Sequence, residues 1–363
     1  PPPPPPPPLF SSRRRHTRLG RWSRGLGDVY KRQGIDSSGA GAGGGAAKLF
    51  AGGTFTLGGT ITADGGSATG NDSGGGSGGA VWIDAGTLSG IGTITADGGN
   101  GNNDGGTGSG GRISIVYDAG TTANYGLQAY GGDADIEHAG PEGDGAAGTI
   151  YTRLVGSNGE LTVDNNEKTD TKYARPYFET ALTLKRIYLR RGALLKFPDT
   201  YSFTIESGGS ITSSGTEKPV LKLDDGATFN ASSLSLSNFR FRHAGVLNAT
   251  SLSLSDMEVD EEDTAQTNGV NSLTIGSGTT YTLYGTGTHT YDAVTIESSG
   301  TLTHGTNTSA QVNEIDISAA SIDIQSGGSI NVDSRGYTSG NGPGAGYGAH
   351  NVNATGGGHG GNG

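Results

Sequence analysis

The sequence predicts an all-β protein, a right-handed parallel β-helix (β-solenoid) with glycine-rich loops. Residues 54–66 align without a gap with residues 87–99, and both segments contain the motif Thr-Ile-Thr-Ala-Asp-Gly-Gly; this is the long repeat. Residues 229–237 align in the same way with residues 247–255; this is the short repeat. Self-similarity at a fixed period marks architectures in which each repeat buries its apolar face against its neighbours. Because the repeats consist of short strand-like motifs and turns without helical periodicity, each repeat is expected to form one coil of a solenoid.

Residues 1–33 do not share this pattern and are excluded from the fold prediction. They begin with eight prolines and continue through basic motifs at 11–18 and 27–33. This run resembles translated sequencing-adapter read-through, of the kind fused to open reading frames in environmental assemblies. The alternative is a basic tail that binds nucleic acid or a membrane surface. We expect a non-native or disordered segment at the start of a metagenomic fragment.

Composition excludes several functions for the rest of the chain. Residues 1–33 hold eight Lys and Arg and one acid, a surplus of seven positive charges, so residues 34–363 hold a net charge of −18, against −11 for the whole chain. Such an acidic body repels phosphate backbones, so no nucleic-acid partner is expected. The chain has no cysteine, which excludes disulfides, thiolate zinc sites and cysteine nucleophiles. No apolar stretch approaches the ~20 residues that span a bilayer, so no membrane span is expected within this sequence.

Residues 34–150 are predicted to be glycine-rich β-solenoid repeats. The strand-like segments 48–50, 80–83 and 112–117 each follow a glycine cluster, directly or after two alanines, and their apolar, β-branched and aromatic residues are typical of short strands. Clusters such as 74–79 are compatible with flexible linkers. Their recurrence at similar repeat positions, each followed by a strand, favours ordered tight loops that need the close backbone approach glycine allows.

Residues 151–320 are predicted to form regular β-helix coils, and residues 321–363 the start of a second glycine-rich module, truncated at its end. Period-2 alternation points one face of each strand into the coil. The residues expected to stack inside are Ile61, Ile94, Leu234, Leu236, Leu252, Leu254, Ile322, Ile324 and Ile330. The related motifs at 205–211, 296–302 and 324–330 each predict a strand, a Ser/Gly turn and a second strand.

Three motifs carry a resemblance to a known group of proteins. They are Gly-Gly-Arg-Ile-Ser-Ile-Val-Tyr at 110–117, Gly-Ala-Ala-Gly-Thr-Ile-Tyr at 145–151 and Gly-Glu-Leu-Thr-Val-Asp-Asn at 159–165. Together they resemble the glycine-rich repeats of large bacterial surface and secreted parallel β-helix proteins, which include adhesin-like and autotransporter-passenger-like chains. The resemblance, one of pattern and composition over most of 40–363, implies an extracellular or cell-surface location and a stalk or adhesive role. It brings no catalytic motif.

Parallel β-helices also include polysaccharide lyases and glycoside hydrolases, so the acidic residues need a separate test. Such activities require two or three carboxylates on one strand face, or a calcium site beside a base. The candidates are Asp64, Asp97 and Asp333, each ending an equivalent motif, and the pair 224–225. Asp64 and Asp97 are expected to stack, which is typical of turn residues that cap their own backbone. Because no His or Lys recurs beside them and the seven His are dispersed, the sequence predicts no enzyme, no catalytic residue and no cofactor.

Two acidic segments and a threonine pattern suggest weaker alternatives. Residues 98–106 are similar to a calcium-binding nonapeptide, but Asp104 is one place late and the apolar residue is missing. The acidic run 256–263 offers more oxygen ligands, and a solvated connecting loop is the favoured interpretation, so no metal-binding residue is predicted. Thr-x-Thr motifs suggest an ice-binding ladder, but the coils at 229–255 carry Leu-Ser-Leu-Ser instead.

The segments 172–177 and 185–191 are rich in Lys, Arg and Tyr and form the clearest basic patch in an acidic chain. One interpretation is that these Arg and Tyr side chains bind an acidic glycan. The favoured one is a strand that points Ile187 and Leu189 inward while its charges protect a sheet edge or the mouth of the coil.

Together, these patterns predict a non-enzymatic structural or adhesive segment of a bacterial cell-surface or secreted β-helix protein. The alternative is a polysaccharide-processing β-helix enzyme, a lyase or a glycoside hydrolase. The partner is unknown from the sequence, with glycans or other surface components as the expected classes.

Overall fold

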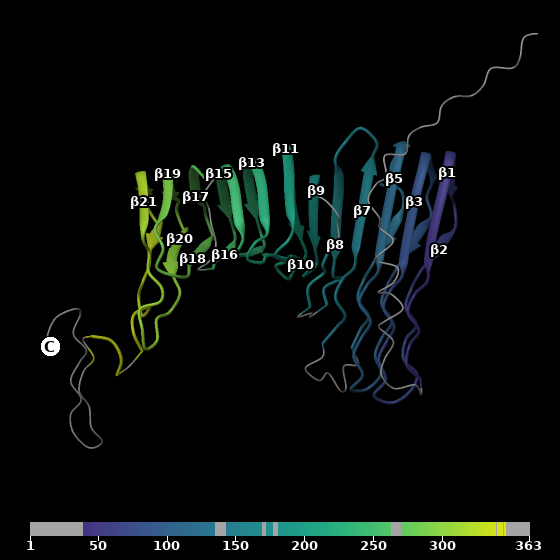
Figure 1. Cartoon of the computed structure of the whole chain (residues 1–363), viewed down its shortest axis with the longest axis horizontal. Coiled ribbons are helices and arrows are strands. Elements are labelled where there is room, and N and C mark those ends of the chain that lie inside the picture. The colour runs from purple at the N-terminus through teal and green to yellow at the C-terminus, as the bar shows by residue number, and fades with distance from the viewer. Residues whose placement is uncertain are drawn as a thin grey trace, which may run out of the picture.

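The computed structural model describes residues 39–134, 143–168, 172–176, 181–262, 270–338, 340–343 and 345. These residues form 22 strands and no helix, and the strands lie in three sheets whose pairs are parallel with one exception (Figure 1). The architecture is therefore all-β with long parallel sheets, as predicted, and is compatible with a β-helix or solenoid. Residues 1–33 lie outside the described part of the chain.

The longest sheet has 12 strands and runs the length of the molecule in Figure 1. Its strands are, in spatial order, β1 (Ala46–Leu57), β3 (Ala80–Gly90), β5 (Arg112–Ala119), β7 (Thr149–Leu154), β8 (Gly159–Asp164), β9 (Leu182–Arg190), β11 (Ser202–Ser214), β13 (Thr228–Ser237), β15 (Val246–Ser255), β17 (Ser272–Ile275), β19 (His289–Ile296) and β21 (Ile317–Ile324). The second sheet contains β10 (Leu194–Phe197), β12 (Val220–Leu223), β14 (Arg240–His243), β16 (Glu258–Glu261), β18 (Thr280–Leu283), β20 (Thr301–His304) and β22 (Ser329–Ile330). The third contains β2 (Thr60–Thr62), β4 (Thr93–Thr95) and β6 (Gly126–Gln128).

Both internal repeats stack in register, as the sequence predicts. Ile61 pairs with Ile94 across β2 and β4, one long repeat apart. Leu234 pairs with Leu252 across β13 and β15, one short repeat apart. Because paired residues on adjacent strands point to the same face, each repeat position becomes a ladder of like side chains.

The direction of the strands reverses once, at a hairpin between β7 and β8. These two strands are antiparallel, with Ile150 opposite Thr162 and Tyr151 opposite Leu161. Gly156 takes a φ of +90° in the turn, a conformation that favours glycine. The hairpin divides the described chain into an N-terminal stack (residues 39–154) and a C-terminal stack (residues 159–338).

The hydrophobic core changes to the opposite face of the sheet at the same hairpin. Ile150 packs in the core of the N-terminal stack, whereas Leu161 and Val163 pack in the core of the C-terminal stack. Since Leu161 is opposite Tyr151 and not Ile150, the two cores lie on opposite faces. The hand of a coil depends on the strand direction, the side on which the core lies and the direction in which the strands succeed one another. At the hairpin the first two reverse and the third does not, so both stacks have the same hand.

The glycine-rich loops of the N-terminal stack are hydrogen-bonded to one another and are not open linkers. Gly76 donates to Gly66 O at 2.9 Å, Gly99 donates to Gly76 O at 2.8 Å, and Gly108 donates to Gly99 O at 2.8 Å. A Cβ atom on Gly76 would lie 2.0 Å from Ala42 O, much closer than any real contact. Only glycine permits this approach, which accounts for the repeated clusters.

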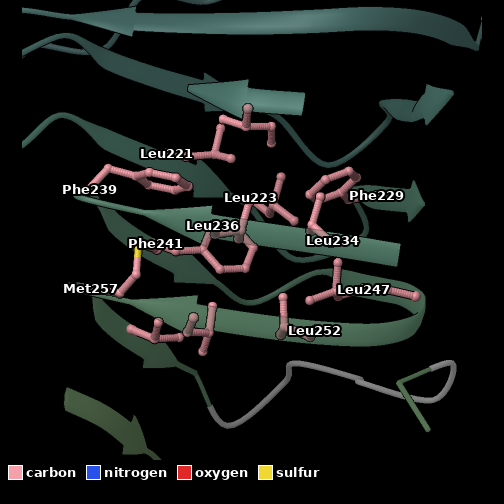
Figure 2. Packing of buried hydrophobic residues seen from close by; sticks show 14 of the residues in the cluster. Leu221, Leu223, Phe229, Leu234, Leu236, Phe239, Phe241, Leu247, Leu252 and Met257 are labelled. Carbon is pink, nitrogen blue, oxygen red and sulfur yellow. The ribbon is translucent and has the colours of Figure 1, made fainter. Parts of the chain in front are cut away.

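The C-terminal stack has the larger core, shown close up in Figure 2. Leu234, Leu236, Leu252 and Leu254 are at most 3% exposed, which confirms their predicted inward direction. Aromatic rings continue the ladder: Phe203 stacks on Phe197 and on Phe229 with centroid separations of 4.0 Å and 4.4 Å. These like-on-like contacts bury apolar surface between successive coils.

Four residues predicted to be buried, three at the C-terminal end and one at the N-terminal end, are more exposed than predicted. Ile322, Ile324 and Ile330 follow the buried ladder positions of Val294, Ile296 and Leu302, yet they are 50%, 47% and 43% exposed. They occupy the inward register, but no described coil covers them. Ile61 is half-buried on the first strand of its sheet, and Ile94, one coil further in, is fully buried.

One predicted turn is also absent. The motif at 205–211 lies within the single strand β11, which has an irregularity between Ile205 and Ser210 instead of a break. The equivalent motifs separate β19 from β20 and β21 from β22, as predicted.

Candidate functional site

The aspartates at the repeat period form a ladder between coils. Asp64 Oδ1 accepts the backbone N–H of Asp97 at 2.7 Å, and Asp97 Oδ1 accepts that of Tyr130 at 2.6 Å. Asp64 Oδ2 also accepts Thr95 Oγ1 at 2.9 Å. The predicted stacking is confirmed, but the expectation that each Asp caps its own backbone is wrong, because each holds the next coil. Burial raises the pKa of Asp97 above its ordinary value; the nearby Asp64 adds to this rise, whereas the Tyr130 amide and Lys168 oppose it. Asp64 and Asp97 each accept a backbone hydrogen bond from the next coil, so the ladder stabilises the contact between coils.

The prediction of a solvated connecting loop is wrong for residues 258–261 of the acidic run, which form a strand, whereas Asp256 lies in an exposed bend before it. Position 263 lies outside the described chain. Residues 258–261 form β16, which lies between β14 and β18. The parallel register sets its carboxylates beside the cations of earlier coils. The pairs are Lys218–Asp256 at 3.0 Å, Arg240–Glu258 at 2.8 Å, Arg242–Asp260 at 3.2 Å and Lys222–Glu262 at 3.3 Å.

The remaining acidic and threonine candidates do not converge. Asp224 pairs with Lys196 at 2.7 Å, and Asp333 is exposed beyond β22. Across the described ranges, no group of three or more His, Asp and Glu side chains is placed to hold a metal ion. The Thr ladder ends after two coils, because Gly126 and Gln128 follow Thr93 and Thr95 in register.

The basic, aromatic segment forms β9 and places its cations on the outer face. Ile187 and Leu189 are fully buried, as predicted. β9 lies inside the sheet between β8 and β11, so its charges do not protect an edge, which corrects that part of the prediction. Ala174 of the other basic segment forms a bridge to Leu195 on β10, and residues 177–180 lie outside the described chain.

Tyr188 lies at the centre of this outer face. Arg186 donates to Tyr188 Oη at 3.1 Å and lies 3.7 Å from Glu160 Oε1. The guanidinium of Arg190 lies 5.2 Å from the centroid of the Tyr188 ring, within the range of a cation–π contact. An arginine on each side therefore fixes the tyrosine on the surface.

Arg191 joins the two stacks beside this surface. Its guanidinium makes two bonds to Asp164, at 2.8 Å and 2.7 Å, and one to Tyr130 Oη of the N-terminal stack at 2.8 Å. The bonds to Asp164 raise the pKa of Arg191, so it is cationic at any working pH. Lys168 makes a parallel connection to Asp133, at 2.7 Å.

A buried polar cluster inside the C-terminal stack was not predicted. Glu261 is fully buried, accepts Tyr281 Oη at 2.6 Å and lies 3.2 Å from His289 Nδ1. His243 pairs in register with Glu261 and is fully buried. His243 and His289 are far apart in sequence, so their position alone does not indicate a cluster. However, one step of the short repeat leads from His243 to Glu261, and this step predicts that these two residues are neighbours.

Burial and pairing change the pKa values of these groups in opposite directions. Desolvation lowers the pKa of His243, whereas the hydrogen bond to Glu261 raises that of His289. Desolvation acts to raise the pKa of Glu261, but the hydrogen bonds from His289 and Tyr281 and the charge of His289 outweigh it, so the pKa of Glu261 is lowered. The cluster lies in the core, so it contributes to stability and pH response.

No protein-family model matches the chain, and no curated protein and no solved structure matches it. Within the described residues, no helix is long and apolar enough to cross a membrane.

Proposed function

We propose that this chain is a non-enzymatic structural or adhesive segment of a bacterial cell-surface or secreted protein, folded as a right-handed parallel β-helix. The observation that carries the proposal is the uninterrupted sheet of 12 paired strands. At the usual strand spacing such a sheet extends roughly 50 Å. A rigid stack of this length holds the protein segments or ligands at its two ends at a fixed separation.

Two further features support a rigid spacer. Polar side chains on the flanks bond to the next coil, as in the Asp64–Asp97 ladder and the Arg240–Glu258 pair. A right hand is expected because crossover connections between parallel strands in one sheet are almost always right-handed. Both stacks share the long sheet and have the same hand, so the flank formed by this sheet continues along the whole length.

The spacer is tested by deleting one coil, residues 238–255, which equals one short repeat. Spin labels on Cys replacing Thr183 and Thr290, both exposed on the long sheet, report its length by pulsed electron paramagnetic resonance. The chain has no cysteine, so only these positions react. We expect the label separation to shorten by about 5 Å, one strand spacing, with the distribution still narrow.

The matched control deletes residues 238–246, half a coil, which reverses the inward and outward faces and should broaden the distribution. A full-coil deletion that unfolds the protein, or leaves the distance unchanged, contradicts the spacer. The alternative function, a polysaccharide lyase or hydrolase, would be favoured by cleavage of pectin or alginate that one Asp substitution abolishes.

A further inference from the structure

An open pocket of about 390 Å³ lies where the carboxyl ends of β8, β9 and β11 meet. Asp164, Tyr188, Arg190 and Arg191 form one side, and residues 212–214 form the other. The pocket is next to the junction of the two stacks, because Arg191 also binds Tyr130.

The cations of this pocket differ in whether they are neutralised. Arg191 is held by Asp164 through two hydrogen bonds. Arg190 is opposite Asp164 in the sheet register, but the carboxylate turns to Arg191. Within the part of the chain that the structure describes, Arg190 is exposed and contacts the Tyr188 ring without a carboxylate partner. Its planar guanidinium is free to bind a carboxylate through two parallel bonds.

Hydroxyl groups continue the site on the neighbouring strand. Thr212 is level with Tyr188 and Ser214 is level with Arg190, and both are exposed on the outer face. Each hydroxyl donates and accepts, as sugar hydroxyls require. The site thus combines the Arg190 cation, an oriented aromatic ring and a row of hydroxyls.

The charge of the molecule limits the ligand further. Residues 34–363 hold a net charge of −18, and an anion with many charges would be repelled by that field. A ligand with one carboxylate among neutral hydroxyls can pair with Arg190, and its single charge keeps the repulsion from the acidic protein small.

We propose that this pocket binds a carboxylate-bearing sugar of a glycan, with Arg190 on the carboxylate and the hydroxyls of Thr212 and Ser214 on the sugar. The inference names a ligand class for the adhesive role and so rests on the proposed function. It assigns the binding to the junction between the two stacks and not to the repetitive flanks.

The test is a nuclear magnetic resonance titration of the full chain with methyl glucuronide, methyl glucoside and acetate. The glucuronide should bind at least about tenfold more tightly than either of the others, since only it offers both the carboxylate and the hydroxyls. Arg190→Gln should weaken glucuronide binding by about tenfold or more, which is the loss of a charge-assisted bond. The control is Arg112→Gln on β5 in the N-terminal stack, outside the pocket, and should leave binding unchanged.

Three outcomes overturn the proposal: no binding of the glucuronide, equal binding of acetate, or binding insensitive to Arg190→Gln. Equal binding of acetate would reduce the pocket to a simple anion site. None of these results affects the label separation in the coil-deletion experiment, so a failed ligand and a failed spacer are distinguishable.

Discussion

His243 is the residue at which the structure makes its most specific prediction about stability. It is fully buried, stacks on Phe241 with a centroid separation of 4.9 Å, and neither ring nitrogen makes a hydrogen bond of normal geometry. Burial lowers its pKa, so the folded protein keeps this ring neutral. Phenylalanine has a similar shape and carries no buried nitrogen, so His243→Phe isolates the effect of the proton.

The size of the effect follows from proton linkage. In the unfolded chain His243 titrates near pH ~6.5, and below that pH the unfolded state binds a proton that the folded state excludes. Each such proton lowers the free energy of unfolding by up to about 1.4 kcal/mol per pH unit. Between pH ~6.5 and pH ~5 the wild type should therefore lose up to about 2 kcal/mol that the His243→Phe variant retains.

Urea denaturation of both proteins at about pH 7.5 and about pH 5 measures this difference. Parallel stability profiles would refute the reasoning, since they would mean that folded His243 takes the proton. His289→Gln is the control of opposite sign. The pKa of His289 is raised by Glu261, so its stabilisation is complete below pH ~6.5 and is lost as pH rises through the folded pKa. The deficit of His289→Gln should therefore be larger at the lower pH.

Three further substitutions, with one control, test the packing and the hydrogen bonds between coils. Leu252→Ala should cost ~2–5 kcal/mol, and limited proteolysis should cut near residue 252 while distant coils stay protected; simultaneous loss of protection along the chain would contradict a stack of coils. Gly76→Ala should destabilise the N-terminal stack by at least about 1–3 kcal/mol, because its Cβ would overlap Ala42 O. Thermal melting measures this loss. The control is Gly53→Ala, whose Cβ would meet no atom within 4 Å, and which should change the stability by no more than about 0.5 kcal/mol. Asp64→Ala should cost about 1 kcal/mol, the value of its bonds to the next coil, and hydrogen exchange at the amide of Asp97 should accelerate; unchanged exchange there would argue against the ladder.

Part of the C-terminal stack was predictable because the short repeat holds from β13 to β15 and from β14 to β16. One step of the short repeat places Leu252 on Leu234, and the same step places Glu261 on His243. The first pair is visible in the sequence because both residues are leucine. The second pair is not, because identical residues reveal a repeat, whereas a coil brings together whatever residues share a register position.

The candidate site could be predicted only in part. The sequence identified the basic, aromatic segment and the inward direction of Ile187 and Leu189. It did not show that Asp164 would neutralise Arg191 and leave Arg190 free, because this choice depends on the direction of two side chains at the end of β9. Similarly, the acidic run was interpreted as a loop because its cationic partners lie on earlier coils, distant along the chain.

The sequence by itself determined that the chain is all-β, that its long and short repeats stack, and which strand faces turn inward, because alternation and repetition are properties of neighbouring residues. Only the tertiary structure decided that the stack reverses at residues 154–159 and that its core changes face there. Ile150 and Tyr151 are both suited to burial, and the sequence does not rank them. Folding buries Ile150 in one core and packs Tyr151 against the other, because a β-strand points successive side chains to opposite faces and each stack covers one of them.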